Sequence, residues 1–328
     1  MKLEEVARLA GVSRTTASYV INGKAAQHRI SAKTQERVMA IVTQYNYKPD
    51  QAATALRLGS SRLLGFILPD LENQSYARLA KLLEAGAREQ GFQLIITCSD
   101  DNPATEMALA EMLVARRIDV LLVASVLESH HSFYRELQAK VPIIAIDRAL
   151  DDDFFASVIS EDMQGAMLLT DSLLVNQPTS IGLIGAVADI AISQQRELGF
   201  RKAISYSAQQ LRPQTQYGDH FSREEGARLC AEWIESGQLP QAILTTSYVL
   251  LEGVLDELVK HPDLLANTKL ATFGDNRLLD FLPVRINALP QQFHLIAEKA
   301  LALTMEAIEH HYKPGIHVVP RRLKIRAE

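Results

Sequence analysis

The sequence predicts a small all-α head followed by an α/β body built from two doubly wound parallel sheets. Three observations support this fold class. The first sixty residues hold short apolar helical patterns around glycines, the remainder alternates β-type apolar runs with amphipathic helices, and that alternation starts again after Phe155. A length of 328 residues, about twice that of a usual single domain, is typical of more than one folding unit.

The composition is that of an ordinary globular protein, with 47% hydrophobic and 22% charged residues. No apolar run approaches the roughly 18 residues of a membrane span, and acidic residues stand where a signal peptide needs a basic start. We therefore expect a cytoplasmic protein with no membrane partner. The two cysteines, Cys98 and Cys230, lack the Cys/His spacing of a metal site or a disulfide framework.

Charge is divided unevenly along the chain. Residues 1–60 hold four lysines and five arginines against three glutamates and one aspartate, a net charge of +5, so the remainder carries −10. A basic segment is typical of a partner that carries phosphates, because its binding releases counterions from the polyanion. The alternative is a charged face that simply meets solvent.

The head begins with two short helices around a tight turn. LEEVARLA at residues 3–10 places its apolar side chains on one face, Gly11 can end that helix, and Ser13 can cap a second helix, RTTASYVIN. In such a helix-turn-helix the N-terminal end of the second helix faces base edges in the major groove. The polar side chains at that end are Arg14, Thr15, Thr16, Ser18 and Tyr19. Ser31 can cap a third helix that ends before Pro49. The alternative is a helical hairpin packed on the body.

The segment after Pro49, DQAATALRLGSSR, is alanine-rich and too short to be a stable helix alone in water. In a dimer, two copies could pack together and insert paired Leu56 side chains into a minor-groove step. A flexible linker is the alternative. The expected domains are thus a helix-turn-helix domain at residues 1–48, a hinge helix or linker at 49–61 and a body at 62–328.

The body is expected to alternate parallel strands with helices. The expected strands are LLGFILP at 63–69, FQLIITC at 92–98, VLLVAS at 120–125, VPIIAID at 141–147, SVISED at 157–162, SIGLIGA at 180–186, TQYGDH at 215–220, QAILTTS at 241–247 and KLATFGD at 269–275. Helices are expected at 76–90, 106–117, 163–175, 196–205, 223–236 and 250–260.

Ligands of such sheets bind outside the carboxyl ends of the strands, so the polar residues there are the candidate site. The set comprises Ser75, Tyr76, Ser125, Asp147, Arg148, Asp162, Arg196, Ser247 and Asp275, with Asp70, Asp100, Asp101 and Asn276 beside them. Carboxylates pair with sugar hydroxyls and guanidinium groups pair with anions, so the set fits a polyhydroxylated, anionic ligand. Any one of these residues alone is typical of a helix N-cap or a surface loop.

Catalytic motifs are missing from the sequence. It holds no GxGxxG after a strand and no GxxxxGK[ST], GxSxG or HExxH. Asp162 and Asp275 could in principle form a glycosidase-like pair, but nothing in the sequence supports that role. We expect no enzyme, no catalytic residue, no cofactor and no metal.

Several segments resemble one known family. LEEVARLAGVSRTTASYVING, ISAKTQERVMAIVTQYNYKPD and AATALRLG resemble the DNA-binding head of the lactose-repressor family of transcriptional regulators. The likeness continues through IGLIGA, QRELGF, ILTTS and ATFGDN of its periplasmic-binding-protein-like body. TTASYVINGKA, PDLENQSYARLA, AIDRALDD and TFGDNRLLDFL resemble the fructose-repressor branch, also called the catabolite repressor/activator branch, with sucrose repressors as near relatives.

The resemblance implies roles for particular residues. In the head it implies base contacts from Arg14, Thr15 and Thr16, phosphate contacts from Thr16, Ser18 and Asn22, and minor-groove insertion by Leu56. In the body it implies that Asp162, Arg196 and Asp275 are sugar-hydroxyl ligands, whereas Ser247 stands where lactose-type members have asparagine. Arg148, beside Asp147, is assigned to a sugar phosphate.

The resemblance also implies an operator-DNA partner and fructose 1-phosphate as the effector, with fructose 1,6-bisphosphate, free fructose and sucrose as alternatives. It implies two subdomains, about 62–159 plus 290–318 and about 160–289 plus 319–328. No leucine heptads follow Arg326, so a homodimer is the minimum expectation and a tetramer stays open. The rival readings are a transport-type sugar-binding protein with the same body and a sugar-processing enzyme.

Overall fold

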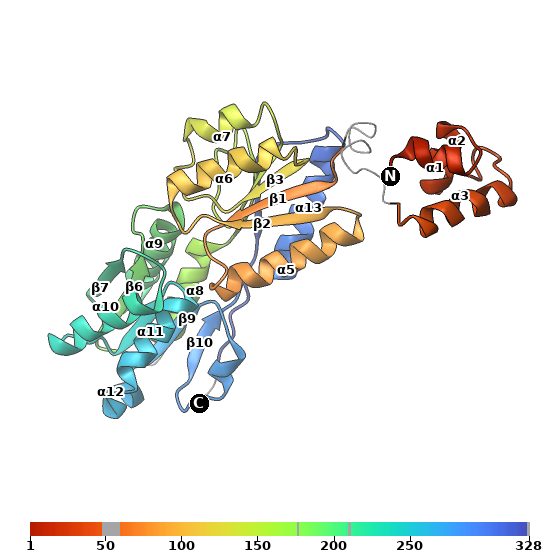
Figure 1. Ribbon diagram of the computed structural model, residues 1–328. Coiled ribbons are helices and arrows are strands. Elements are labelled where there is room, and N and C mark those ends of the chain that lie inside the picture. The colour runs from red at the N-terminus through yellow and green to blue at the C-terminus, as the bar shows by residue number, and fades with distance from the viewer. Residues whose placement is uncertain (48–59, 176, 209–210, 327–328) are drawn as a thin grey trace. The chain divides into compact units, whose positions relative to one another are not determined.

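The computed structural model describes residues 1–47, 60–175, 177–208 and 211–326 (Figure 1). The chain divides into two compact units, Met1–Ser61 and Arg62–Glu328. The candidate Leu56 lies outside the described residues.

The head is a bundle of three helices, α1 (Leu3–Leu9), α2 (Arg14–Ile21) and α3 (Ala32–Gln44). The N-caps are those predicted: the Ser13 hydroxyl accepts a hydrogen bond from the Thr16 backbone, and the Ser31 hydroxyl from that of Thr34. Val6, Ala17 and Val38 from the three helices are fully buried together. A small core of this kind holds the second helix in a fixed orientation while its polar end stays at the surface.

The first part of the body is a six-stranded parallel sheet, called sheet A here. Its strand order is β11-β5-β4-β3-β1-β2. The strands are β1 (Leu63–Leu68), β2 (Gln93–Cys98), β3 (Val120–Val123), β4 (Ile143–Ile146), β5 (Ala156–Ser160) and β11 (Gly315–Val319). Helices α5 (Gln74–Glu89) and α13 (Phe293–Ile308) cover one face, and α6 (Pro103–Ala115) and α7 (Ser132–Leu137) cover the other. Sheet A and these helices form the N-lobe.

The second part is a five-stranded parallel sheet, sheet B, with strand order β10-β9-β8-β6-β7. Its strands are β6 (Ile181–Ala186), β7 (Pro213–Gly218), β8 (Ala242–Thr245), β9 (Lys269–Phe273) and β10 (Ile286–Leu289). Helices α8 (Asp162–Leu174) and α9 (Ala191–Tyr206) cover one face, and α10 (Arg223–Glu235) and α11 (Tyr248–Leu258) the other. With α12 (Pro262–Asn267) and the 3₁₀ helix η1 (Arg277–Asp280), these elements form the C-lobe.

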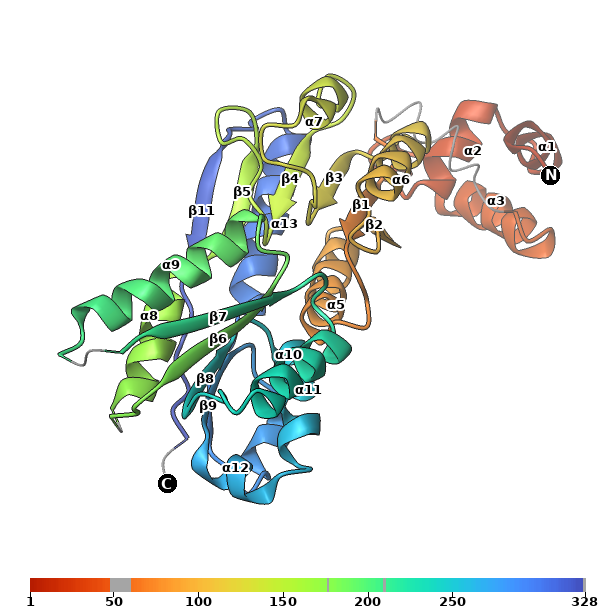
Figure 2. The same ribbon diagram turned by 90° about the vertical axis from the view of Figure 1, so that its left-hand side faces the viewer.

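The two lobes are separate blocks with helices on both sides of each sheet (Figure 2). The chain passes between them three times, after β5, after β10 and after β11. The last passage leads residues 320–326 from the N-lobe to the C-lobe, where Lys324 forms a bridge with Ala288 of β10. The end of the chain therefore contributes side chains to the region between the lobes.

The predicted fold class is confirmed, and the predicted strands and helices lie within a few residues of the observed ones. The sequence patterns do not predict α7, α12, β10, α13 or β11. Within the described residues, no helix is both long enough and apolar enough to cross a bilayer.

Candidate functional sites

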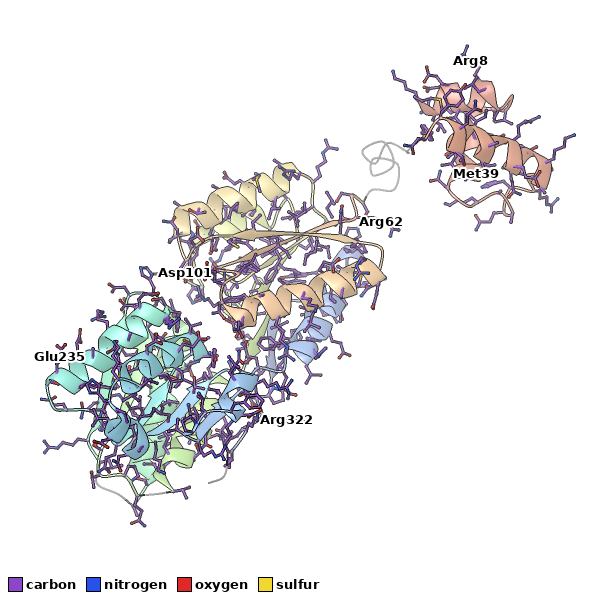
Figure 3. The ribbon with its side chains drawn as sticks, turned by 60° about the horizontal axis from the view of Figure 1, so that its bottom comes forward. Arg8, Met39, Arg62, Asp101, Glu235 and Arg322 are labelled. Carbon is purple, nitrogen blue, oxygen red and sulfur yellow. The ribbon has the colours of Figure 1, made fainter. Side chains whose placement is uncertain are left out.

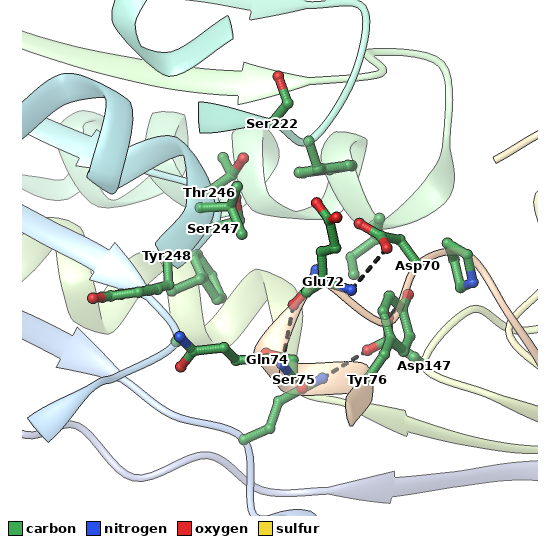
Figure 4. A pocket seen from close by; sticks show the side chains of 18 of the residues that line it. Asp70, Glu72, Gln74, Ser75, Tyr76, Asp147, Ser222, Thr246, Ser247 and Tyr248 are labelled. Atoms are coloured by element: carbon green, nitrogen blue, oxygen red, sulfur yellow. Dashed lines mark hydrogen bonds between the residues drawn. The ribbon is translucent and has the colours of Figure 1, made fainter. Parts of the chain in front are cut away.

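A cavity of about 510 Å³ lies between the two lobes, at the carboxyl ends of strands from both sheets. This volume lies within the range of pockets for small metabolites. It is lined by seven of the nine predicted site residues, Ser75, Tyr76, Asp147, Arg148, Arg196, Ser247 and Asp275, and by Asp70, Asp100 and Asp101 beside them. Figure 4 shows polar side chains from α5 and from the start of α11 that face this cavity.

The N-lobe wall of the cavity is built around Asp147, the residue that follows β4. The Tyr76 hydroxyl donates to one Asp147 oxygen over 2.9 Å, and the Gln291 amide donates to the other over 2.6 Å. Burial and the Asp147 charge raise the pKa of Tyr76 well above its ordinary value, so Tyr76 stays a neutral hydrogen-bond donor. Asp147 is thus held from two sides by neutral donors.

Arg148 extends from the same wall. Its Nη1 donates to Asp101 over 2.9 Å and, at 3.5 Å, to the Ser125 carbonyl. Its side chain is only 12% exposed, and its Nε is buried without a hydrogen-bond partner. Burial lowers the pKa of an arginine, but interactions with Tyr76 and with the Asp101 and Asp147 carboxylates outweigh that effect and raise the pKa of Arg148. A buried guanidinium with an unused donor is suited to an anionic ligand group.

The C-lobe wall contains two arginines that share one carboxylate. Arg196 of α9 contacts Asp162 over 2.8 Å, and Arg321, after β11, contacts the same oxygen over 3.1 Å. Both guanidinium groups lie over the Phe273 ring. Burial lowers the pKa of Arg321, and its Nε also lacks a partner. Two cations on one anion make this part of the C-lobe wall locally positive.

Asp275, which follows β9, is held by the end of the chain. Arg326 contacts one of its oxygens over 2.5 Å, and Lys324 contacts the other over 3.3 Å. Both cations also contact Asp280 of η1. Asp275 therefore lines the cavity with a fixed orientation and with its charge largely neutralised.

Three predicted site residues have positions other than those expected. Ser125 does not line the cavity: its buried hydroxyl donates to Glu106 of α6 over 2.5 Å. Asp162 lies behind Arg196 and Arg321 instead of lining the cavity. Ser247 does line it, but its hydroxyl caps α11 by accepting from Leu250, which is the N-cap alternative considered above.

Several cavity residues were not predicted from the sequence. They include Gln74, Gln291, Phe273, Tyr248, Glu252 and Arg321. Phe273 ends β9 and Tyr248 begins α11, so the strand-end rule could have found them. Arg321 and Gln291 lie on segments that pass between the lobes, for which strand patterning gives no signal.

The second candidate site is the exposed end of α2 in the head. Arg14 and Thr15 are exposed, and Arg14 forms an ion pair of 3.0 Å with Glu4 in which both side chains are more than half exposed. An exposed pair of this kind contributes only about 0–1 kcal/mol, so Arg14 can exchange it for another partner at little cost. The neighbouring Tyr19 ring stacks on His28 at a centroid distance of 3.5 Å.

The remaining head residues are partly engaged with one another. The Thr16 hydroxyl lies 2.8 Å from that of Ser13, and the Asn22 amide donates to the Ser18 carbonyl over 2.6 Å. These contacts orient the second helix and its end. Arg8 and Met39, labelled on the head in Figure 3, lie on the two other helices, α1 and α3.

A helix-turn-helix head followed by a two-lobed, ligand-binding body defines a class of bacterial DNA-binding regulators. The model of bacterial regulatory proteins of the lacI family matches residues 2–50, and that of periplasmic binding proteins and sugar-binding domains of the LacI family matches residues 61–249. The chain belongs to the lacI family. It is 57% identical to the fructose operon regulatory protein of Vibrio cholerae, over 99% of this chain and all of that protein. It is 42% identical to the catabolite repressor/activator of Escherichia coli K12, over 98% of this chain and 97% of that protein.

Solved structures extend the comparison. The Cra transcriptional dual regulator of Pseudomonas putida, in complex with fructose 1-phosphate, is 50% identical, with a TM-score of 0.77 over 81% of this chain and 99% of that one. The lac repressor dimer bound to operator has a TM-score of 0.85 over 99% of this chain and 98% of that one, and at 20% identity it supports the fold alone. The predicted family is confirmed. Since this is a family of regulators and its close relatives are regulators, the prediction that the chain is not an enzyme is confirmed as well.

Proposed function

We propose that the chain is a sequence-specific transcriptional regulator of fructose and central carbon metabolism, and that fructose 1-phosphate bound in the cavity releases it from operator DNA. One observation carries the choice of effector: two guanidinium groups that line the cavity, those of Arg148 and Arg321, each keep a buried Nε without a hydrogen-bond partner. An anionic group on a sugar can pair with such guanidinium groups. The relative solved with fructose 1-phosphate supports the same ligand.

The residues have distinct proposed roles. Arg148 meets the phosphate, while Asp147 and Asp275 accept hydrogen bonds from sugar hydroxyls. Arg196 and Arg321 complete the positive side, with Asp162 orienting them from behind. Ser75, Tyr76 and Ser247 line the cavity, whereas Ser125 acts from outside it.

The DNA-binding surface is the α2 end of the head. Arg14, Thr15, Thr16 and Tyr19 are proposed to read base edges, Ser18 and Asn22 to contact phosphates, and Leu56 to enter the minor groove. Regulation of this kind places the protein in the cytoplasm, as a homodimer or a tetramer, on a near-palindromic operator. The proposed domain boundaries remain 1–48, 49–61 and 62–328.

Effector and operator act through two states of the body. Fructose 1-phosphate binds more tightly to the released state. Operator DNA must therefore lower the affinity for the effector by the same factor by which the effector lowers the affinity for operator DNA. This reciprocity gives the proposal a quantitative test.

The test is calorimetric titration of the full chain with fructose 1-phosphate, fructose 1,6-bisphosphate, fructose and sucrose, each with and without a duplex selected from a random pool. We expect fructose 1-phosphate to bind most tightly and to lose affinity about 5- to 150-fold when the duplex is bound. Equal affinity with and without the duplex would contradict the coupling. Tighter binding of sucrose or free fructose would replace the proposed effector, and failure to select any duplex would contradict DNA recognition.

A further inference from the structure

Glu106 is a completely buried carboxylate in the first turn of α6, outside the cavity. Its oxygens accept three hydrogen bonds, from the Ser125 hydroxyl over 2.5 Å, the Tyr134 hydroxyl over 2.6 Å and the Val126 backbone over 2.8 Å. The apolar side chains of the N-lobe core surround this cluster. Burying a carboxylate among apolar groups costs free energy, and hydrogen bonds to the carboxylate offset that cost.

These bonds fix the segments that hold Arg148. Arg148 has two acceptors in the N-lobe, the Asp101 carboxylate and the Ser125 carbonyl. Asp101 lies immediately before the cap of α6, and Ser125 follows β3. Glu106 joins these two segments directly, because it lies on α6 and holds Ser125 and Val126. Figure 3 shows Asp101 at the edge of the N-lobe that faces the C-lobe.

Two further contacts tighten the same loop. The Ser125 hydroxyl, while donating to Glu106, accepts from the Leu127 backbone over 3.0 Å. Tyr134 is fully buried on α7, and burial together with the Glu106 charge raises its pKa, so it remains a neutral donor. The loop after β3 is thus fastened at consecutive residues, and its carbonyl has little freedom to leave Arg148.

From this geometry we propose that Glu106 is a positioning residue for Arg148 and so sets the affinity of the cavity for a phosphorylated ligand. The inference rests on the proposed role of Arg148 as the phosphate-binding cation. Glu106 never touches the ligand. It fixes the spacing between the Asp101 carboxylate and the Ser125 carbonyl, and these two acceptors hold the Arg148 guanidinium at the cavity wall.

A double-mutant cycle tests the link. Fructose 1-phosphate binding is measured by calorimetry for the full chain, Glu106→Gln, Arg148→Met and the combined variant. Glutamine keeps the size of the side chain, but Ser125 and the Val126 backbone donate to different oxygens of Glu106, and in glutamine one of these is replaced by an NH₂ group that cannot accept. We expect Glu106→Gln to weaken binding about tenfold when Arg148 is present and less than twofold when it is methionine.

The control is Glu197→Gln, which removes another carboxylate that accepts from a tyrosine hydroxyl, that of Tyr217 at 2.8 Å, and that does not line the cavity. We expect it to leave the affinity unchanged. If Glu106→Gln does not fold, Ser125→Ala replaces it in the same cycle, because it removes one of the three bonds to Glu106, together with the Leu127 contact, and keeps the other two bonds to Glu106. A loss of equal size in both Arg148 backgrounds overturns the inference and leaves the proposed function intact. No binding of fructose 1-phosphate by the unaltered chain overturns the proposed function instead.

Discussion

The two walls of the cavity hold their charged groups in different ways. On the N-lobe wall, Asp147 is fixed by two neutral donors and Arg148 by a single carboxylate, that of Asp101. On the C-lobe wall, one carboxylate is shared by two cations, as where Asp162 binds both Arg196 and Arg321. The N-lobe wall therefore holds its charged groups by separate contacts, whereas the C-lobe wall holds them in shared ion pairs.

The difference follows from where the partners lie in the chain. The contacts of Arg148 lie within the first half of the body, at Asp101 and Ser125. Those of the C-lobe wall depend on Arg321, Lys324 and Arg326, which the chain supplies only after its third passage between the lobes. The last few residues thus complete the C-lobe wall, and we expect it to be the wall on which stability depends more strongly.

The largest effect is expected from Asp162→Asn. This change leaves two buried guanidinium groups without their shared carboxylate, and removal of one member of a buried ion pair costs about 3–5 kcal/mol. Urea unfolding of the full chain measures the loss. Asp101→Asn on the N-lobe wall is the matched control: its side chain is 27% exposed and has one cationic partner, so we expect a clearly smaller loss than for Asp162→Asn. Equal losses for the two variants would contradict the contrast between the walls.

The place of each residue in the chain explains which cavity residues the sequence could predict. Residues directly after a strand, such as Asp147, Arg148 and Asp275, were found because the carboxyl ends of parallel strands meet at one edge. Whether such a residue faces the ligand depends on its partners, which pattern alone does not reveal. Ser125 also follows a strand, yet its hydroxyl turns inward because the buried Glu106 from α6 accepts a hydrogen bond from it.

Residues on the passages between the lobes were not predictable in this way. Arg321 lines the cavity because the chain crosses from β11 to pair with β10. This pairing is a long-range contact, and no periodic pattern of apolar residues predicts it. Gln291 follows β10, a short strand whose four residues include the polar Asn287 and which the apolar-run criterion therefore missed. Repeated local patterns predict the fold class, whereas part of the cavity lining, including Arg321 and Gln291, comes from contacts between segments far apart in sequence.

A smaller effect is expected on acidification, again on the C-lobe wall. Hydrogen bonds from Lys324 and Arg326 hold the pKa of Asp280 below its ordinary value. A carboxyl with a lowered folded-state pKa stabilises the fold above its unfolded pKa of about 3.9, and this stabilisation is lost as the pH falls through the lowered value. Asp280→Asn should therefore reduce the free energy of unfolding at pH 6, and its difference from the unaltered chain should shrink below about pH 4. Asp263→Asn, an exposed carboxylate of α12, is the control. A difference that stays constant down to pH 3 would contradict a role for this ion pair.

The smallest effect is expected where the two walls meet. The Asn276 amide of the C-lobe donates to the Gln74 side chain of the N-lobe over 2.7 Å, at an exposed position beside the cavity. Gln74→Ala removes this bond but keeps the cap that Asn276 provides to η1. An exposed neutral hydrogen bond contributes about 0.5–1 kcal/mol, so we expect the affinity for fructose 1-phosphate to fall about two- to fivefold, because the ligand must then hold the lobes together by itself. Gln194→Ala, whose amide bonds within the C-lobe, should have no effect. A loss of affinity of a hundredfold or more would mean that the lobes are joined mainly through this contact. That result would contradict the contrast between the two walls.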